Sequence, residues 1–235
     1  MSDTDETRTS PMVRRVSAIA ALDEPARRLL YEFVVGQAAP VSRDEAAEAA
    51  GTPRATVAFH LDKLVAEGLL EVVYERRTGR SGPGAGRPAK LYRRSPEHVA
   101  VSLPERRYEL AARLLADALH EAETSGEAPG EALRRRAREL GEEIGEGARR
   151  AGEDHAAVLR ALRDFGFEPR IDGDTVVLVN CPFHSLAQLH TELVCGMNLR
   201  LVDGVLDGIA ATGITARLAP GPGHCCVRLA GTPSA

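Results

Sequence analysis

Three consecutive helical patterns near the N-terminus constrain the fold more than any other feature of this 235-residue sequence. A capping box, formed by Ser42 and by Glu45 three residues later, opens the second pattern. Thr52 is the predicted N-cap of the third pattern, and Pro53 follows it in the position that favours proline. A glycine closes each pattern. The predicted helices cover residues 22–36, 42–50 and 52–68. Short helices joined by tight turns predict a helix-turn-helix arrangement.

The hydrophobic period changes after the third helix. Residues 69–74 and 89–93 are predicted strands, and the stretch between them, residues 78–88, is rich in Gly, Pro and Arg. Two strands around such a loop predict a β-hairpin. Helices followed by a hairpin are typical of a winged helix-turn-helix, which we expect over residues 17–98, after a disordered tail at residues 1–16.

Positive charge gathers in the same region. Residues 51–94 hold nine Lys and Arg against four acidic residues, although the whole chain has a net charge of −4. DNA phosphates attract such a surplus, and the third helix of this arrangement enters the major groove. We therefore expect double-stranded DNA as the partner, with the hairpin loop as a wing. The predicted buried face of the helix is Val57, Leu61, Leu64 and Val65. The predicted DNA-binding residues are Thr52, Arg54, Thr56, His60 and Lys63 on the helix, and Arg76, Arg77, Arg80, Arg87 and Lys90 on the wing and its return strand.

The segment from Thr52 to Leu70 resembles the recognition helix of the arsenical-repressor-like winged regulators. Their motif His-Leu-x-x-Leu-x-x-x-Gly-Leu is present here from His60 onward, and the stretch from Gly86 to Tyr92 resembles the return strand of their wing. The resemblance implies a transcriptional regulator. Such regulators usually read paired half-sites, so we expect a homodimer.

Two further regions follow the predicted wing. Residues 101–151 carry a highly charged helical pattern. We interpret this region as a connector, whose helices either mediate dimerisation or simply form a solvated link. Residues 153–235 are expected to form an α+β sensor domain. Its predicted helices cover residues 155–165 and 191–209, and its predicted strands cover residues 168–171, 175–179, 214–218 and 225–229. The predicted fold class of the whole chain is therefore α+β.

All four cysteines lie within 46 residues of this last region, namely Cys181, Cys195, Cys225 and Cys226. In a reducing compartment such clustering indicates a metal or redox role more than disulfides. The alternative is that each cysteine is a small buried apolar residue. Because adjacent strand residues point to opposite faces, we expect Cys225 rather than Cys226 to face a shared site.

The spacing Cys181-x13-Cys195-x29-Cys225 and the stretch Asn180-Cys-Pro-Phe-His184 resemble the iron–sulfur repressors of the Suf cluster-assembly operon. The resemblance implies that a [4Fe–4S] or [2Fe–2S] cluster, held by these three cysteines, controls DNA affinity. Thiolates suit zinc as well. A regulator that responds to zinc, another metal, thiol chemistry or a small molecule is therefore the alternative. The candidates for a fourth ligand are Cys226, His184, His190, His224 and an external group.

Other classes of protein are not indicated. The sequence has no apolar run of about 18 or more residues, and its N-terminus lacks the apolar segment of a signal peptide. We therefore expect a cytoplasmic protein without a membrane partner. No Ser/His/Asp order, phosphate-binding loop or carboxylate pair is evident, so we predict no enzymatic activity.

Overall fold

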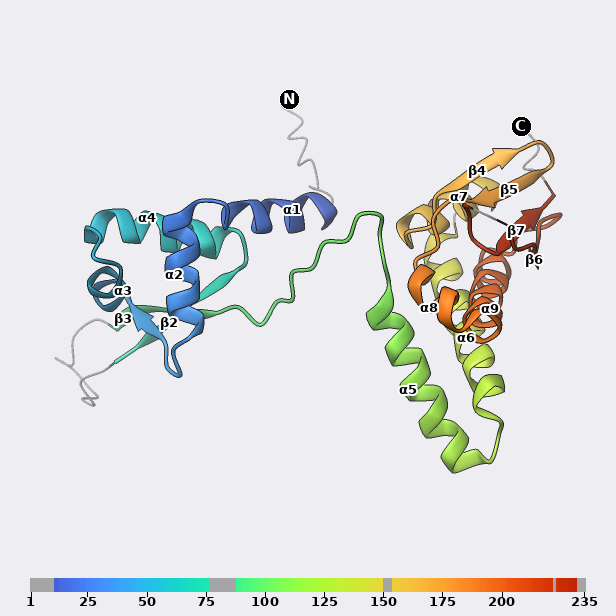
Figure 1. Cartoon of the computed structure of the whole chain (residues 1–235), viewed down its shortest axis with the longest axis horizontal. Coiled ribbons are helices and arrows are strands. Elements are labelled where there is room, and N and C mark those ends of the chain that lie inside the picture. The colour runs from blue at the N-terminus through green and yellow to red at the C-terminus, as the bar shows by residue number, and fades with distance from the viewer. Residues whose placement is uncertain (1–10, 77–87, 150–153, 222, 232–235) are drawn as a thin grey trace, which may run out of the picture. The chain divides into compact units, whose positions relative to one another are not determined.

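The computed structural model describes residues 11–76, 88–149, 154–221 and 223–231. It divides into two compact units, Met1–Val101 and Ser102–Ala235 (Figure 1). The chain contains both helices and antiparallel sheets, which confirms the predicted α+β fold class. None of the described helices is long and apolar enough to cross a membrane.

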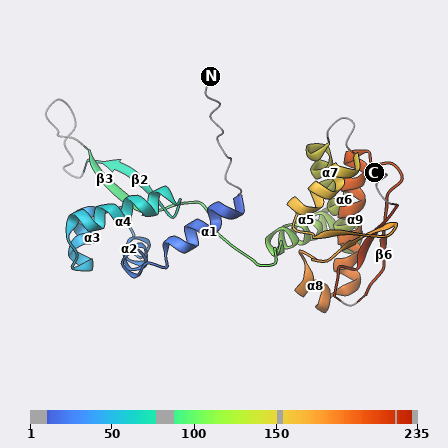
Figure 2. The same ribbon diagram turned by 90° about the horizontal axis from the view of Figure 1, so that it is seen from above.

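The N-terminal unit contains the predicted winged helix-turn-helix. Its helices are α1 (Pro11–Ala21), α2 (Pro25–Val35), α3 (Arg43–Ala50) and α4 (Arg54–Ala66), and its strands are β1 (Val41–Ser42), β2 (Leu70–Glu75) and β3 (Ala89–Arg94). The strands form an antiparallel sheet in the order β1-β3-β2. The hairpin of β2 and β3 lies beside α4 (Figure 2).

Helix α1 corrects the predicted tail. Residues 11–16, expected to be disordered, form the first turns of α1, and residues 1–10 lie outside the described part of the chain. Ala18 and Ala21 of α1 are buried in the core of the unit. The burial of these small side chains orders the helix, and the polar composition of the preceding residues conceals that contact in the sequence.

The turns around α3 follow local signals with one exception. The Glu45 amide donates to Ser42 Oγ at 3.2 Å, and the Ser42 amide donates to Glu45 Oε2 at 2.7 Å, which confirms the capping box. Gly51 closes α3 with a φ of 58°, in the left-handed region that favours glycine. The predicted Thr52 cap is wrong. Pro53 occupies the N-cap position of α4, and the Thr52 hydroxyl instead donates to the Ala50 carbonyl at 3.1 Å.

Hydrogen bonds to an aspartate of α4 hold the hairpin against this helix. Tyr92 of β3 is fully buried, and its hydroxyl donates to Asp62 Oδ1 at 2.9 Å. Lys90 Nζ donates to the same oxygen at 2.6 Å. Burial opposes ionisation of Asp62, but hydrogen bonds from Lys90 and Tyr92 keep the pKa of this carboxyl below its ordinary value. The charged carboxylate therefore fixes the position of the wing strand relative to α4.

The C-terminal unit has one continuous core. Its helices are α5 (Tyr108–Ser125), α6 (Pro129–Ala148), α7 (Asp154–Asp164), α8 (His184–Leu189) and α9 (Thr191–Ile209), and its strands are β4 (Pro169–Asp172), β5 (Thr175–Leu178), β6 (Thr215–Leu218) and β7 (Val227–Ala230). The antiparallel sheet, in the order β4-β5-β7-β6, lies to one side of α6 and α9 (Figure 2). Helices α5 and α6 share this core, so the predicted separate connector at residues 101–151 is instead part of the C-terminal unit.

Glycines bring the backbones of α6 and α9 into direct contact. Gly141 and Gly145 of α6 face Gly204 and Gly208 of α9. A methyl group at any of the four would overlap backbone atoms of the opposite helix. Because α9 carries Cys195, this close pairing of α6 and α9 also fixes the position of that cysteine.

Candidate nucleic-acid interface and cysteine site

Helix α4 has a buried face and an exposed face. Val57, Leu61 and Leu64 are fully buried, as predicted, and Val65 is partly buried. The exposed residues of α4 are Arg54, Ala55, Thr56, Phe59, Asp62, Lys63 and Ala66. Phe59 is not among the predicted DNA-binding residues, although its position two residues from both Val57 and Leu61 places it opposite the buried stripe.

The predicted cations of α4 are paired with carboxylates. Arg54 Nε lies 2.7 Å from Asp44 Oδ1, and Lys63 Nζ contacts Glu67 one turn later. Both pairs include an exposed cation, and ion pairs at the surface contribute little to stability. Arg54 and Lys63 are therefore able to exchange these partners for DNA phosphates.

The other predicted DNA contacts differ in accessibility. Thr52 and His60 are half-buried, Thr56 is exposed, and Arg76 is exposed at the end of β2. The His60 ring packs edge-on against Phe59 with the ring centroids 5.5 Å apart. Lys90 is bound to Asp62, as described above. Arg77, Arg80 and Arg87 lie outside the described residues.

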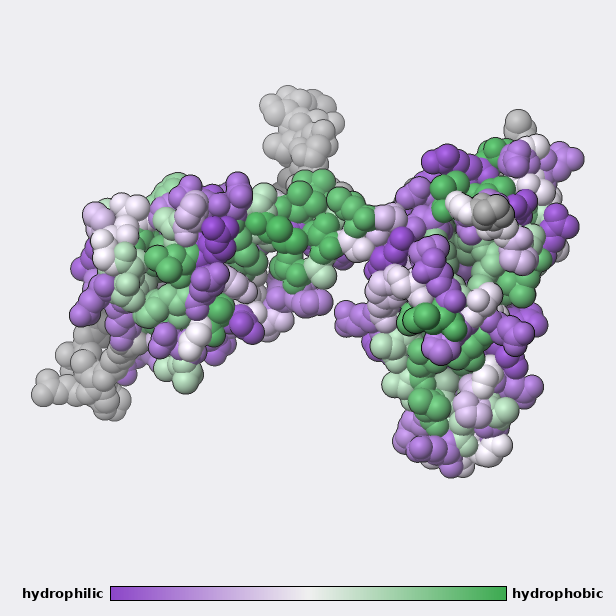
Figure 3. Space-filling model, in the orientation of Figure 1, coloured by the Kyte–Doolittle hydropathy of each residue, from purple (hydrophilic) through white to green (hydrophobic). Residues whose placement is uncertain are grey.

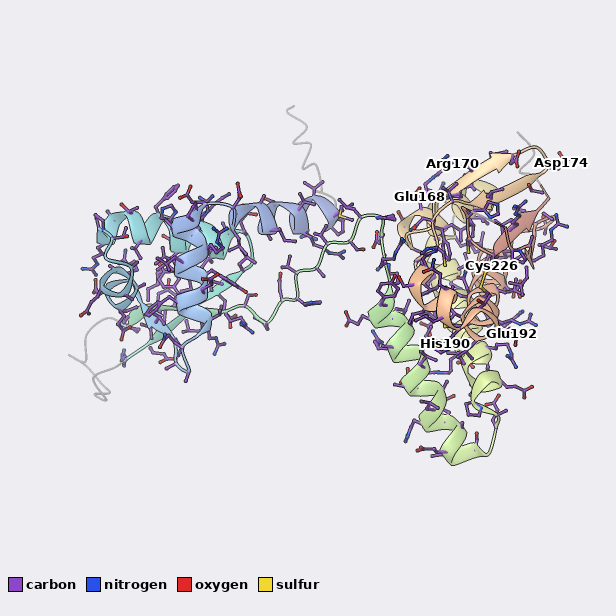
Figure 4. The ribbon with its side chains drawn as sticks, in the orientation of Figure 1. Glu168, Arg170, Asp174, His190, Glu192 and Cys226 are labelled. Atoms are coloured by element: carbon purple, nitrogen blue, oxygen red, sulfur yellow. A yellow bond between two sulfur atoms is a disulfide. The ribbon has the colours of Figure 1, made fainter. Side chains whose placement is uncertain are left out.

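The four cysteines form two pairs. Cys195 of α9 and Cys226 are joined as a disulfide with Cα atoms 6.4 Å apart, drawn in yellow beside the Cys226 label in Figure 4. Cys181 and Cys225 are buried free thiols that hydrogen-bond each other. Cys225 and Cys226 precede β7 rather than belonging to it, and they turn to different partners. The observed pairing thus differs from the predicted grouping of Cys181, Cys195 and Cys225.

The buried thiol pair is surrounded by N–H donors. Asn198 Nδ2 of α9 donates to Cys225 Sγ at 3.1 Å, and the Val227 amide donates to the same sulfur at 3.5 Å. The hydrogen bond from Cys225, assisted by the Phe183 amide, lowers the pKa of the Cys181 thiol against the effect of burial. The same bond, together with burial, raises the pKa of Cys225. Ionisation of one thiol of this pair therefore opposes ionisation of the other.

The segment that enters the C-terminal unit is bound to the Cys181 loop. The Arg107 amide donates to the Pro182 carbonyl at 3.0 Å, and Arg106 Nη1 donates to the Cys181 carbonyl at 3.2 Å and to Asn180 Oδ1. Asn180 Nδ2 donates in return to the Glu105 carbonyl at 3.0 Å. We call these contacts of residues 105–107 with residues 180–182 the linker clamp. The linker clamp was not predicted, since no local sequence pattern links positions so far apart.

The histidines considered as fourth ligands are separate from the thiols or bound elsewhere. His184 and His190 are exposed, and His224 Nε2 lies 2.8 Å from Arg228 Nη2. Within the described ranges, no group of three or more His, Cys, Asp or Glu side chains is arranged to hold a metal ion. The disulfide leaves only Cys181 and Cys225 as free thiols.

Comparison with known proteins agrees with the geometry of the N-terminal unit. A family described as helix-turn-helix domain matches residues 22–73, a range that includes α2, α3, α4 and most of β2. With its hairpin beside α4, this unit has the arrangement of a winged helix-turn-helix DNA-binding domain. The chain is a DNA-binding regulator of transcription. None of the curated proteins and none of the solved structures shows significant similarity to it.

Proposed function

We propose that the four cysteines of the C-terminal unit control the DNA affinity of this regulator and that they hold an iron–sulfur cluster when reduced. The observation that carries the proposal is the arrangement of the four cysteines, from three separate segments, in two sulfur pairs, the Cys195–Cys226 disulfide and the free thiols Cys181 and Cys225. The backbone of Cys181 is part of the linker clamp. A reducing cytoplasm, the location expected from the sequence, keeps such thiols available for a metal.

The donor set would suit a cluster once the Cys195–Cys226 disulfide is reduced and the two sulfur pairs come together. Cys181, Cys195, Cys225 and Cys226 would supply the thiolates that such clusters require. The N–H groups of Asn198 and Val227 that already donate to Cys225 are of the kind that tunes the reduction potential of a cluster. When bound, the cluster supplies an oxidant-sensitive link among the segments that carry these cysteines.

Cluster binding and the disulfide exclude each other, because both use the sulfur atoms of Cys195 and Cys226. Reduction of the disulfide by a dithiol adds two electrons and two protons and releases both thiols. In the reverse step a small-molecule disulfide accepts the two electrons and two protons, becomes two thiols, and the S–S bond of Cys195 and Cys226 reforms. The site therefore has two chemical states that differ in how α9 is connected to the turn before β7.

The linker clamp offers a route from these states to the DNA-binding unit. Arg106 and Arg107 bind the backbone of Cys181 and Pro182, so a displacement of this loop moves the chain segment that leads from Val101. A change of state then shifts the population of DNA-binding arrangements, as in other ligand-controlled switches.

A second candidate is a dithiol–disulfide switch with no iron. It is favoured by the Cys195–Cys226 disulfide itself, which needs no metal to alternate between two states. In its reduced form the same set of four thiolates suits zinc as a Cys₄ site.

Metal analysis of protein purified under strict anaerobic conditions separates these candidates. We expect stoichiometric iron and acid-labile sulfide together with broad visible absorbance, and we expect a Cys181→Ser variant to lose them. Stoichiometric zinc in colourless protein would instead identify the zinc form. Absence of every metal, with four titratable thiols in the reduced chain, would leave the dithiol switch.

We also propose that the regulator is a homodimer that uses α1. Val13, Val16 and Ile19 are 54%, 46% and 47% exposed and recur along α1 at a three-residue spacing. Figure 3 shows an apolar surface over α1. A second copy is the partner that the reading of paired half-sites requires.

A charge in the centre of this α1 face is expected to separate the dimer. Val16→Glu leaves the buried residues of α1 unchanged but would place a carboxylate in the contact, so sedimentation equilibrium should give the mass of a monomer. Ile171→Glu is the matched control, because Ile171 is an exposed aliphatic residue of β4. Equal masses for the wild type and both variants would exclude α1 as the dimer contact.

A further inference from the structure

The large apolar side chain on the exposed face of α4 is Phe59, which is 66% exposed. It lies on the side opposite Val57, Leu61 and Leu64, which are all fully buried. A phenylalanine in this position adds nothing to the core cluster of the unit. Its ring is therefore available to a partner that approaches the outer face of α4.

The surroundings of Phe59 favour a nucleic acid as that partner. One turn before it, Ala55 is small and exposed, and one turn after it, Lys63 carries a positive charge. Thr56 lies on the same face. The His60 ring, half-buried and edge-on to Phe59, limits the directions open to the phenyl ring. An apolar side chain, Phe59, with a cation, Lys63, beside it is complementary to the DNA major groove, where apolar groups of the bases lie between the phosphates of the two strands.

We propose that Phe59 is a specificity-determining residue that contacts the 5-methyl group of a thymine in the major groove. The thymine methyl is the apolar group that the major groove presents, and phenylalanine is among the side chains that contact it. The proposal rests on the assignment of α4 as the DNA-reading helix. It adds the base that this helix reads and the side chain that reads it.

The test uses the full-length protein and a DNA site selected with it from a random double-stranded pool. Each thymine of the site is replaced in turn by deoxyuridine, which removes only the methyl group. We expect one replacement in each half-site to weaken wild-type binding about fivefold. Phe59→Ala should bind the thymine site about as weakly as the wild type binds the uracil site, with no further loss on uracil DNA.

Two variants control this result. Phe59→Leu keeps an apolar side chain and should retain part of the preference for thymine. Lys63→Ala removes a charge from the same face and should weaken binding to thymine and uracil sites alike, with a smaller dependence on salt. Because Phe59 is exposed, thermal unfolding of Phe59→Ala should match that of the wild type.

The outcomes are distinct. Phe59→Ala that still distinguishes thymine from uracil as the wild type does would overturn the methyl contact, and so would an equal loss of affinity for both DNAs. Wild-type protein that selects no DNA from the pool would overturn the DNA-reading role of α4 itself, and this inference with it.

Discussion

Replacing Gly204 with alanine is expected to unfold the C-terminal unit or to destabilise it severely. The added methyl group would overlap the carbonyl oxygen of Arg138 and lie 2.9 Å from the Glu142 nitrogen, both on α6. Backbone atoms cannot rotate away as a side chain can, so α6 and α9 must move apart. Overpacking of this kind costs about 3 kcal/mol or more, a large share of the roughly 5–15 kcal/mol that stabilises a typical domain.

The same two helices provide matched controls for this prediction. A methyl group at Gly196 of α9 or at Gly147 of α6 meets no atom within 4 Å. Alanine at either position should leave stability unchanged or raise it by up to about 1 kcal/mol, since alanine is the better helix former. Urea unfolding followed by circular dichroism gives the comparison. Equal midpoints for Gly204→Ala and Gly196→Ala would show that α6 and α9 do not meet through their glycines.

Replacing Cys225 with serine is expected to abolish the response of DNA affinity to redox state. Cys225 hydrogen-bonds Cys181 and receives N–H donors from Asn198 and Val227, so its loss removes one of the proposed cluster ligands and the partner of Cys181. Operator affinity, measured by fluorescence anisotropy, should then be the same within about twofold in anaerobic and in oxidised protein.

Variants of the linker clamp distinguish loss of the metal from loss of coupling. Arg106→Gln keeps all four cysteines but removes a charged donor to Asn180 and to the Cys181 carbonyl. It should bind metal as the wild type does and show a reduced difference in DNA affinity between the two states. Arg113→Gln changes an exposed arginine of α5 and serves as the control. A full response in Arg106→Gln would mean that coupling does not pass through Arg106.

Local signals were sufficient for the elements that carry DNA binding. The capping box at Ser42, the stripe of Val57, Leu61 and Leu64, and the change of period after Gly68 each act within a few residues, and the structure has the corresponding helices and hairpin. The bounds of α9, Thr191–Ile209, also follow from its continuous apolar pattern. The predicted DNA-binding residues of α4 are all polar and so do not include Phe59, although this residue is exposed on the same helix.

Features that depend on contacts between distant segments were not predicted. The pairing of Cys195 with Cys226 depends on how α9 meets the turn before β7. The inclusion of α6 in the C-terminal core depends on glycines at a four-residue spacing, Gly141 and Gly145, whose partners lie on α9. That spacing was visible in the sequence, but nothing local identifies the helix against which it packs.

The most direct test of thiol-controlled DNA binding is the operator affinity of wild-type protein in its two states. Protein purified and loaded with metal without oxygen is titrated against labelled operator, and the titration is repeated after oxidation to the Cys195–Cys226 disulfide, which mass spectrometry verifies. Our account predicts dissociation constants that differ by about tenfold or more, the range typical of allosteric coupling. Equal dissociation constants, with the disulfide verified, would contradict it and leave the chain as a DNA-binding regulator whose cysteines do not control it.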